Sequence, residues 1–334
     1  MSEATRTMVP GYRHRPGHHC GSTALRNLLA HHGVEISEEM ALGLGAGACL
    51  YFVPLEDQSP SRFLNGRTAR LEEQFVELTG APLELATFDD AEASWNAARG
   101  SIEAGAPAIL LTDLYHLDHY GNSAHFPGHA VVLAGFDEEV ALLSDTAFDD
   151  LQTTTLEGLK RARHSQHPVF QLAGHMFTAG EGIERFDPRD AAPDAIAACA
   201  RRMLEPPMGE FEGLPAMRRF ADEVADWPDL LDDWRWTARF SYQVIERRGT
   251  GGGNFRLMYS RFLAECADGG LASVTREQAE LAERAAGAWT ALAGELQAAS
   301  EEEEPSAERR RAIGERAESV RSLEERLWGE LSAV

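Results

Sequence analysis

The stretch GHHCGSTALRNLL, residues 17–29, decides how the first half of this sequence is interpreted. Its apolar residues recur with the spacing of one helix face, and Gly33 is a typical residue for ending such a helix. Cys20 therefore falls at the start of the helix. Unpaired backbone N–H groups and the helix dipole favour a thiolate at that point, and so a nucleophile. The alternative is a small buried cysteine, which is the usual role of a free cysteine.

Two later stretches supply partners for this thiol. FPGHAVVLAGFD (126–137) places His129 at the start of an apolar strand, and ALLSDTAF (141–148) places Asp145 near the end of the next one. In a hairpin turning at Glu138, positions 129 and 145 are almost opposite, so their side chains meet on one face. Thiol, imidazole and carboxylate then follow in the order of papain-like thiol enzymes, with His129 taking the proton and Asp145 orienting the ring. The alternative is a structural histidine and a turn aspartate.

Strand and helix patterns in the first half indicate an α+β fold with an antiparallel sheet. Apolar runs with β-branched residues predict strands at 108–115, 129–137 and 139–148, and the short link DEE predicts a hairpin between the last two. Helical spacing is seen at 67–78 and 93–107. Helices followed by consecutive hairpins are typical of α+β rather than of alternating α/β proteins.

The second half has a helical character. We predict a papain-like domain at 10–178 and a mainly helical domain at 179–334. Two amphipathic helices, at about 275–299 and 307–331, are separated by SEEEEPS and are expected to form a helical hairpin.

Composition excludes several classes of protein. The 334 residues contain 54 Asp and Glu against 31 Lys and Arg, a formal charge of -23, so nucleic acid and anionic membranes are unfavourable partners. No apolar run approaches the roughly 20 residues that span a bilayer, and the polar start does not resemble a signal peptide. The four cysteines lie far apart, which predicts reduced thiols in the cytoplasm: Cys20, Cys49, Cys199 and Cys266.

A histidine-rich stretch, YHLDHYGNSAHF (115–126), follows the first predicted strand. His116 and His119 have HxxH spacing and His125 lies nearby, but HxxH without an adjacent glutamate is a weak zinc signal. We expect a loop over the active site with His119 in contact with substrate, and no metal.

The second unusual stretch is ERRGTGGGNFRLMY (246–259). Its glycines and arginines predict an anion-binding nest at the start of a helix, without the pattern of a Walker A loop. We therefore expect Glu246, Arg247 and Arg256 to contact substrate. A flexible connection with solvated arginines is the alternative.

Together these motifs resemble a known family. HHCGSTALRNLLAHHG, GLGAGACLYFVP and PGHAVVLAGFD with SDTAF are similar to the N-terminal domain of butirosin biosynthesis protein H, and IERRGTGGGNFRLMYSRFL resembles the domain of unknown function that commonly follows it. The resemblance implies transfer of an aminoacyl group from an acyl-carrier-protein thioester to an amine, as in aminoglycoside biosynthesis. It implies that Cys20 accepts the acyl group, that His129 acts as base and then acid, and that Asp145 orients His129.

The sequence departs from the papain pattern at one point. No glutamine precedes the cysteine in YRHRPGHHC, so His14 or His18 is expected to complete the oxyanion hole with the Cys20 N–H group.

The leading hypothesis is thus a cysteine-dependent acyltransferase in natural-product biosynthesis. It would take an acyl-carrier protein or acyl-CoA as donor and a small-molecule amine as acceptor, and it needs no cofactor. A thiol peptidase or amidohydrolase would use the same triad with water as acceptor, and a non-catalytic binding protein would keep only the fold. The sequence leaves open whether the chain forms a homo-oligomer.

Overall fold

The computed structural model describes residues 6–122, 124–168, 170–271 and 273–334, and the chain forms two compact units. The sheet unit comprises Met1–Ala41 and Glu72–Pro188, and the helical unit comprises Leu42–Leu71 and Arg189–Val334. The chain passes from the sheet unit to the helical unit at 188/189, and the segment 42–71 also belongs to the helical unit.

The sheet unit contains one antiparallel sheet with helices packed on it. Its strands have the order β4-β9-β5-β6-β7-β8, and β1 pairs with β6. The elements are β1 (Thr7–Met8), α1 (Cys20–His31), α3 (Leu71–Thr79), β4 (Leu83–Ala86), α4 (Ala91–Glu103), β5 (Ala108–Asp113), η1 (Leu114–His116), η2 (Asp118–Tyr120), β6 (Pro127–Phe136), β7 (Val140–Ser144), β8 (Gln152–Thr155), α5 (Leu156–Arg163), β9 (Met176–Ala179) and η3 (Ile183–Arg185). This confirms the predicted α+β fold class with an antiparallel sheet.

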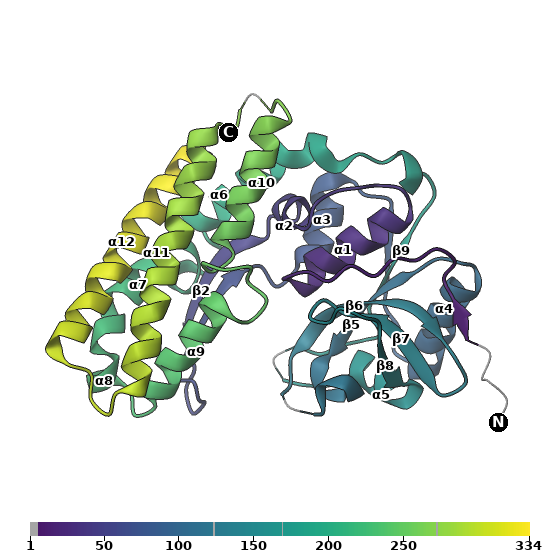
Figure 1. The fold of residues 1–334 in the computed structure, drawn as a ribbon, viewed down its shortest axis with the longest axis horizontal. Helices are drawn as coiled ribbons and strands as arrows, with labels where there is room; N and C mark the ends of the chain where they lie inside the picture. Colours follow the sequence, from purple (N-terminus) through teal and green to yellow (C-terminus); the bar gives the residue numbers. More distant parts are fainter. Residues whose placement is uncertain (1–5, 123, 169, 272) are drawn as a thin grey trace. The chain divides into compact units, whose positions relative to one another are not determined.

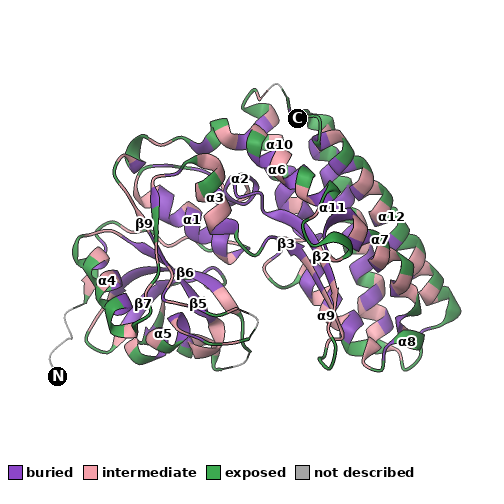
Figure 2. Cartoon of the chain, turned by 180° about the vertical axis from the view of Figure 1, so that it is seen from behind, coloured by how far each residue is buried: buried purple, intermediate pink, exposed green. Residues whose placement is uncertain are grey.

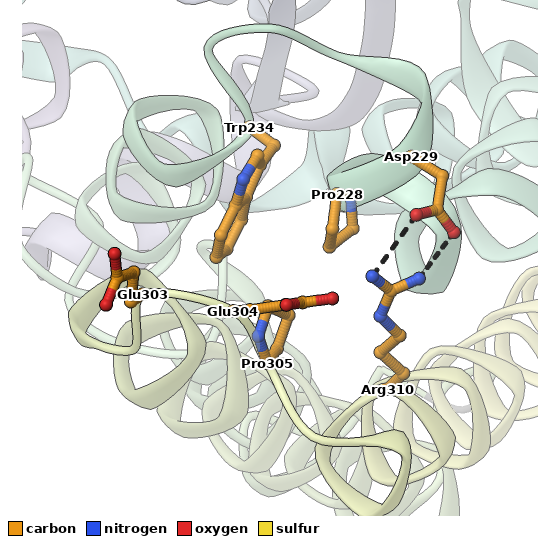
Figure 3. A pocket seen from close by; sticks show the side chains of 7 residues that line it. All are labelled: Pro228, Asp229, Trp234, Glu303, Glu304, Pro305 and Arg310. Carbon is orange, nitrogen blue, oxygen red and sulfur yellow. Dashed lines mark hydrogen bonds and ion pairs between the residues drawn. The ribbon is translucent and has the colours of Figure 1, made fainter.

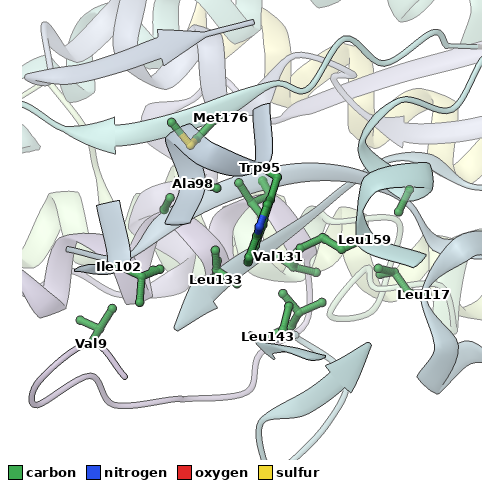
Figure 4. Close-up of a cluster of buried hydrophobic side chains, with 14 residues drawn as sticks. Val9, Trp95, Ala98, Ile102, Leu117, Val131, Leu133, Leu143, Leu159 and Met176 are labelled. Carbon is green, nitrogen blue, oxygen red and sulfur yellow. The ribbon is translucent and has the colours of Figure 1, made fainter. Parts of the chain in front are cut away.

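The core of the sheet unit explains how α1 is placed. Trp95 of α4 and Leu159 of α5 pack with Val131 of β6 in a cluster of buried apolar side chains (Figure 4). Helix α1 packs against β6 and β5, with Leu25 and Leu28 fully buried. In Figure 1 and Figure 2, α1 lies on one side of these strands and α5 on the other.

The hairpin of β6 and β7 brings its two polar residues together in the register of a turn centred on Glu138, as predicted. Val132 is opposite Ser144, and a bulge lies between Leu133 and Gly135. One step further along this register, Asp145 comes opposite position 131, so His129 is its diagonal neighbour rather than its direct partner. Because side chains alternate along a strand, both residues still belong to the same face.

The helical unit has a two-stranded sheet among its helices. Its elements are α2 (Glu38–Leu44, which begins in the sheet unit), β2 (Ala48–Pro54), β3 (Arg62–Arg67), η4 (Pro188–Ala191), α6 (Ala192–Leu204), η5 (Gly209–Phe211), α7 (Gly213–Glu223), η6 (Val224–Asp226), α8 (Trp227–Leu230), α9 (Trp234–Glu246), α10 (Arg256–Asp268), α11 (Arg276–Glu301) and α12 (Ala307–Leu331). Strand β2 packs against α6 and α7, where Phe52 is fully buried against Phe220 and Trp227.

Helices α11 and α12 form the predicted hairpin. Thr275 caps α11 through a capping box with Gln278, and Ser306 caps α12. Among the described residues, no helix combines the length and the apolarity needed to cross a membrane.

Candidate active site

Cys20 is the first residue of α1. The preceding residue, His19, caps the helix: its Nδ1 accepts a hydrogen bond from the Ser22 N–H group at 3.3 Å. The Cys20 side chain is partly exposed, whereas the other three cysteines are buried. The nucleophile predicted from the sequence therefore stands at a helix N-terminus and is open to reagents.

The three residues predicted as a triad come together. His129 Nε2 lies 3.0 Å from Asp145 Oδ1 and 3.1 Å from Asp145 Oδ2. The His129 side chain acts electrostatically on the Cys20 thiol and lowers its pKa. Since Nε2 faces the carboxylate, Nδ1 is the ring nitrogen left for the thiol. Asp145 is completely buried and His129 is 6% exposed.

The electrostatics of this cluster favour an ion pair of thiolate and imidazolium. Burial opposes ionisation of Cys20, but the charges and hydrogen bonds of His19 and His129 outweigh it and lower the Cys20 pKa well below its usual range. Burial likewise lowers the His129 pKa, yet the Asp145 carboxylate and the thiol raise it overall to about 10. The Asp145 pKa lies below its usual range in spite of burial, because His129 and His119 stabilise its charge.

The other thiols have the opposite property. Burial raises the pKa of Cys49 to about 12, that of Cys199 to about 11 and that of Cys266 to about 12. Cys20 alone among the four cysteines has a lowered pKa.

Two further residues bind the carboxylate of the triad. His119 Nε2 lies 3.0 Å from Asp145 Oδ2, and the Tyr120 hydroxyl donates to Asp145 Oδ1 at 3.2 Å. The His119 side chain is only 6% exposed. The structure thus places His119 behind the triad rather than at a surface open to substrate, which corrects the prediction of a substrate contact. The sequence analysis missed Tyr120, because nothing in its neighbourhood points to a carboxylate 25 residues away.

Glu38 is a second residue that the sequence analysis missed. Its buried carboxylate accepts hydrogen bonds from the backbone N–H groups of His18 (2.9 Å) and His19 (2.7 Å) and from the Thr23 hydroxyl (3.0 Å). An added Cβ at Gly17 would stand 2.5 Å from the Glu38 carboxylate, so glycine is required for this approach. Glu38 therefore fixes the chain on both sides of Cys20.

The two histidines predicted as oxyanion donors, His14 and His18, have different surroundings in the structure. Both ring nitrogens of His14 are used, by Ser144 Oγ (2.7 Å) and by the Phe148 carbonyl (2.8 Å), so His14 has no N–H group left for an oxyanion. It serves instead to join the N-terminal segment to the chain around Asp145. His18 is exposed, and its backbone N–H group is bound to Glu38. His19, which was not predicted, is the neighbour whose charge does most to lower the Cys20 pKa.

The predicted substrate contacts of the second half are mainly structural. Arg256 is completely buried; its guanidinium donates to both Glu324 oxygens (2.7 and 3.1 Å) and to the carbonyls of Cys49 and Gly66. It is therefore unavailable to a phosphate. Glu246 Oε1 accepts from the Gly253 N–H group (3.1 Å), so the predicted anion nest already holds a carboxylate of its own chain. Arg247 is exposed and remains a candidate contact.

The helical unit has a pocket of its own, formed where α8 and α9 approach the link between α11 and α12 (Figure 3). Asp229 and Arg310 are paired on one side of it, and Trp234 stands opposite. The lining residues include none of those predicted from the sequence; they are Pro228, Asp229, Trp234, Glu303, Glu304, Pro305 and Arg310.

The histidine-rich stretch divides between two clusters. His119 is hydrogen-bonded to the Asp145 carboxylate. His116 and His125 lie instead with Asp113, in a group whose possible ligand atoms are all within 4.8 Å of one another. That second group has the composition of a metal site.

Two family models match this chain. Residues 19–146 match the N-terminal domain of butirosin biosynthesis protein H, and residues 157–331 match a domain of unknown function, DUF4872, which covers slightly more than half of the chain. No curated protein matches. A solved structure from Bacillus anthracis, described as a C39-like peptidase, is similar at 17% identity with a TM-score of 0.36, over 52% of this chain and 96% of that one. The chain belongs to the DUF4872 family, and its N-terminal side matches the N-terminal domain of butirosin biosynthesis protein H.

Proposed function

We propose that this protein is a cysteine-dependent acyltransferase, which carries an acyl or aminoacyl group from a thioester donor through a Cys20 thioester to an amine acceptor. The observation that supports it most is a partly exposed cysteine at a helix start, together with a histidine that is held by a buried carboxylate and lowers the Cys20 pKa. The match to butirosin biosynthesis protein H supports a biosynthetic transfer rather than protein breakdown.

In the first half-reaction the Cys20 thiolate attacks the carbonyl carbon of the donor thioester. The tetrahedral intermediate collapses by breaking the bond to the donor sulfur, and the His129 imidazolium gives its proton to the departing thiolate. The products are acyl-Cys20, a free donor thiol and neutral His129. Because one thioester replaces another, this step is close to isoenergetic, and the donor is a carrier protein or coenzyme A.

In the second half-reaction the amine attacks the Cys20 thioester. Neutral His129 accepts the proton that the nitrogen loses, and the C–S bond breaks to give an amide and the Cys20 thiolate beside a renewed imidazolium. Asp145 stays charged throughout, because its role is to hold the His129 ring in one orientation and to stabilise the imidazolium.

The oxyanion of each intermediate needs donors close to Cys20. The backbone N–H group of Cys20 belongs to the first helical turn, where N–H groups have no partner within the helix. We assign the second contribution to the His19 side chain, which directly precedes Cys20 at the start of α1 and would take the place of the papain glutamine.

The acceptor is proposed to be a cationic small molecule. An amine carrying further ammonium groups is attracted by a protein of net charge -23, whereas an anionic acceptor is repelled.

The test is to let water and amine compete for the acyl enzyme. The chain is incubated with a panel of short acyl and aminoacyl thioesters together with a polyamine, and amide and free acid are quantified. We expect amide to exceed acid, and both to disappear in Cys20→Ala but not in the matched variant Cys266→Ala. Acid as the main product at saturating amine would identify a thiol hydrolase instead.

A further inference from the structure

The loop between β5 and β6 holds a group of side chains outside the triad that has the features of a metal site. Asp113 ends β5, His116 ends η1, and His125 precedes β6. The strands pair Asp113 with Pro127, so the hairpin itself brings His125 back to Asp113. The His125 Nδ1 atom lies 2.8 Å from Asp113 Oδ2.

The two better-buried members of this group are fixed before any metal binds. Asp113 is completely buried, and its carboxylate accepts from Ser165 Oγ (2.7 Å) and from the Phe126 N–H group (2.9 Å). Such bonds to a ligating carboxylate are typical of the outer shell of metal sites. The His116 ring is held by an edge-to-face contact with the Tyr115 ring, whose centroid lies 5.2 Å away.

The His125 ring is held by stacking. Its centroid lies 4.0 Å from that of Tyr115 and 4.8 Å from that of His167, with nearly parallel planes in both cases. The His125 side chain is 39% exposed. The group therefore has solvent on one side, where a water molecule can complete a coordination shell.

From these contacts we infer that Asp113, His116 and His125 form a binding site for one divalent transition metal of the zinc class. Two imidazoles and one carboxylate are a usual ligand set for zinc, with water in the fourth position. The ligand atoms already lie within 4.8 Å of one another, and tetrahedral ligands of zinc stand about 3.4 Å apart, so the side chains need to move by roughly 1 Å. A metal would take the place of the hydrogen bond between His125 Nδ1 and Asp113 Oδ2, and the single proton of the neutral ring would move from Nδ1 to Nε2.

A route for the ion is present beside the group. An open cavity of about 540 Å³ is lined by His116 and by Ser165, the residue bonded to Asp113. The cations at the edge of this cavity are paired, Lys160 with Glu92 and Arg161 with Glu157, so they do not present a net positive barrier.

The position of the site gives it a role. The metal would close the loop whose middle, η2, carries His119 and Tyr120, and these two residues hold Asp145. A metal at the ends of the loop would therefore steady the carboxylate of the triad without contacting substrate. This inference does not depend on acyl transfer, because the readouts below measure binding alone.

The test uses the untagged full chain with Zn²⁺ and with Co²⁺ as a spectroscopic probe. We expect one Zn²⁺ per chain by equilibrium dialysis and a Co²⁺ spectrum of four-coordinate nitrogen and oxygen ligation without a thiolate band. His125→Ala, an exposed and readily tolerated change, should weaken binding at least about tenfold, and His116→Ala should do the same. His164→Ala is the matched control, because His164 lines the same cavity but lies outside the ligand group.

Further results would overturn the inference. They are the absence of stoichiometric binding, equal affinity of His125→Ala and the wild type, and an equal loss in His164→Ala. A thiolate band that disappears in Cys20→Ser would place the metal at the triad instead. Zn²⁺ should also raise the thermal unfolding midpoint of the wild type by several degrees and leave that of His125→Ala unchanged.

Discussion

At the scale of single residues, the Cys20 thiol depends on two imidazoles. A helix N-terminus alone favours a thiolate modestly, but here His19 and His129 both act on the sulfur, and Asp145 keeps His129 charged. The alternative of an inert buried cysteine describes Cys49, Cys199 and Cys266 instead, since burial raises the pKa of each.

The pH dependence of Cys20 follows from these pKa directions. The Cys20 pKa is lowered. The alkylation rate therefore stays high as pH falls through the range in which ordinary thiols become protonated, and it declines only at lower pH. In His129→Ala the midpoint of the rate profile should move upward toward about 8.5, the value of a free thiol. The measurement is the iodoacetamide rate against pH for both proteins; superimposable profiles would show that His129 does not act on the thiol.

The alkaline limit of the reaction has a separate cause. His129 has a pKa raised to about 10, so the imidazolium that protonates the leaving thiolate is lost as pH rises through that value. We expect acyl transfer to fall there, as measured by initial rates of thiol release from the best thioester donor. Constant rates well above pH 10 would contradict the general-acid role.

Tyr120 is a positioning residue for the triad. Tyr120→Phe removes one hydrogen bond from Asp145, a loss of about 1 kcal/mol, or roughly a fivefold lower kcat with unchanged KM. Tyr115→Phe is the control, because Tyr115 lies on the same loop but does not contact Asp145. An altered KM with normal kcat would assign Tyr120 to substrate binding.

At the scale of elements, the segment before α1 is organised by one carboxylate. Glu38 binds the backbone at His18 and His19 and the hydroxyls of Ser22 and Thr23. The same segment is joined to the end of β7 by the hydrogen bond from the Gly17 N–H group to the Thr146 carbonyl (3.1 Å). The start of α1 and the chain around Asp145 are thus held together by backbone contacts as well as by His14.

Replacing Glu38 should loosen this segment. Glu38→Gln keeps the shape but places an amide NH₂ group among N–H donors, so we expect about 2 kcal/mol lower stability toward urea and slower Cys20 alkylation. Glu35→Gln, at an exposed neighbouring carboxylate, should change neither quantity. Equal behaviour of the two variants would contradict the role of Glu38.

At the scale of the whole molecule, local sequence patterns predict elements better than their partners. Helical spacing and the interruption SEEEEPS locate α11 and α12 almost to the residue, and apolar runs with β-branched residues locate β6 and β7. The three residues of the triad could be predicted from the sequence because two of them belong to neighbouring strands and the third stands at the start of a helix. The bulge after Leu133 shifts the register by one position, and His129 and Asp145 lie on one face.

What the sequence does not predict depends on contacts between distant segments. The hairpin of β2 and β3 belongs to the helical unit rather than to the sheet unit because Phe52 is buried against α7 and α8. No local sequence pattern predicts that contact. The sequence around Arg256 is typical of an arginine that binds a ligand. In the structure, however, the Arg256 guanidinium forms an ion pair with Glu324, which lies 68 residues later in the chain. The hydrogen-bond partners of Glu38 and Tyr120 could not be predicted either, because they also lie in distant segments of the sequence.

The buried ion pair of the helical unit gives a prediction at this scale. Glu324 also accepts from the indole N–H groups of Trp289 (2.7 Å) and Trp328 (2.5 Å), so it is the centre of a buried polar network. Arg256→Ala leaves this carboxylate buried without its cation and should cost about 3–5 kcal/mol of stability. Arg247→Ala, at an exposed arginine, should cost less than about 0.5 kcal/mol. Urea unfolding of both variants provides the comparison; a stable Arg256→Ala protein with a raised donor KM would restore Arg256 as a substrate contact.

The central claim is that Cys20 is an activated nucleophile, and selective alkylation tests it without knowledge of the substrate. The native chain is treated with a limited amount of iodoacetamide at neutral pH, and the adduct is located by intact-mass and peptide-mass spectrometry. We predict one adduct, on Cys20, which is absent from Cys20→Ala and forms much more slowly in His129→Ala. Modification of Cys20 no faster than of Cys49, Cys199 or Cys266 would contradict the claim and leave the chain as a non-catalytic binding protein.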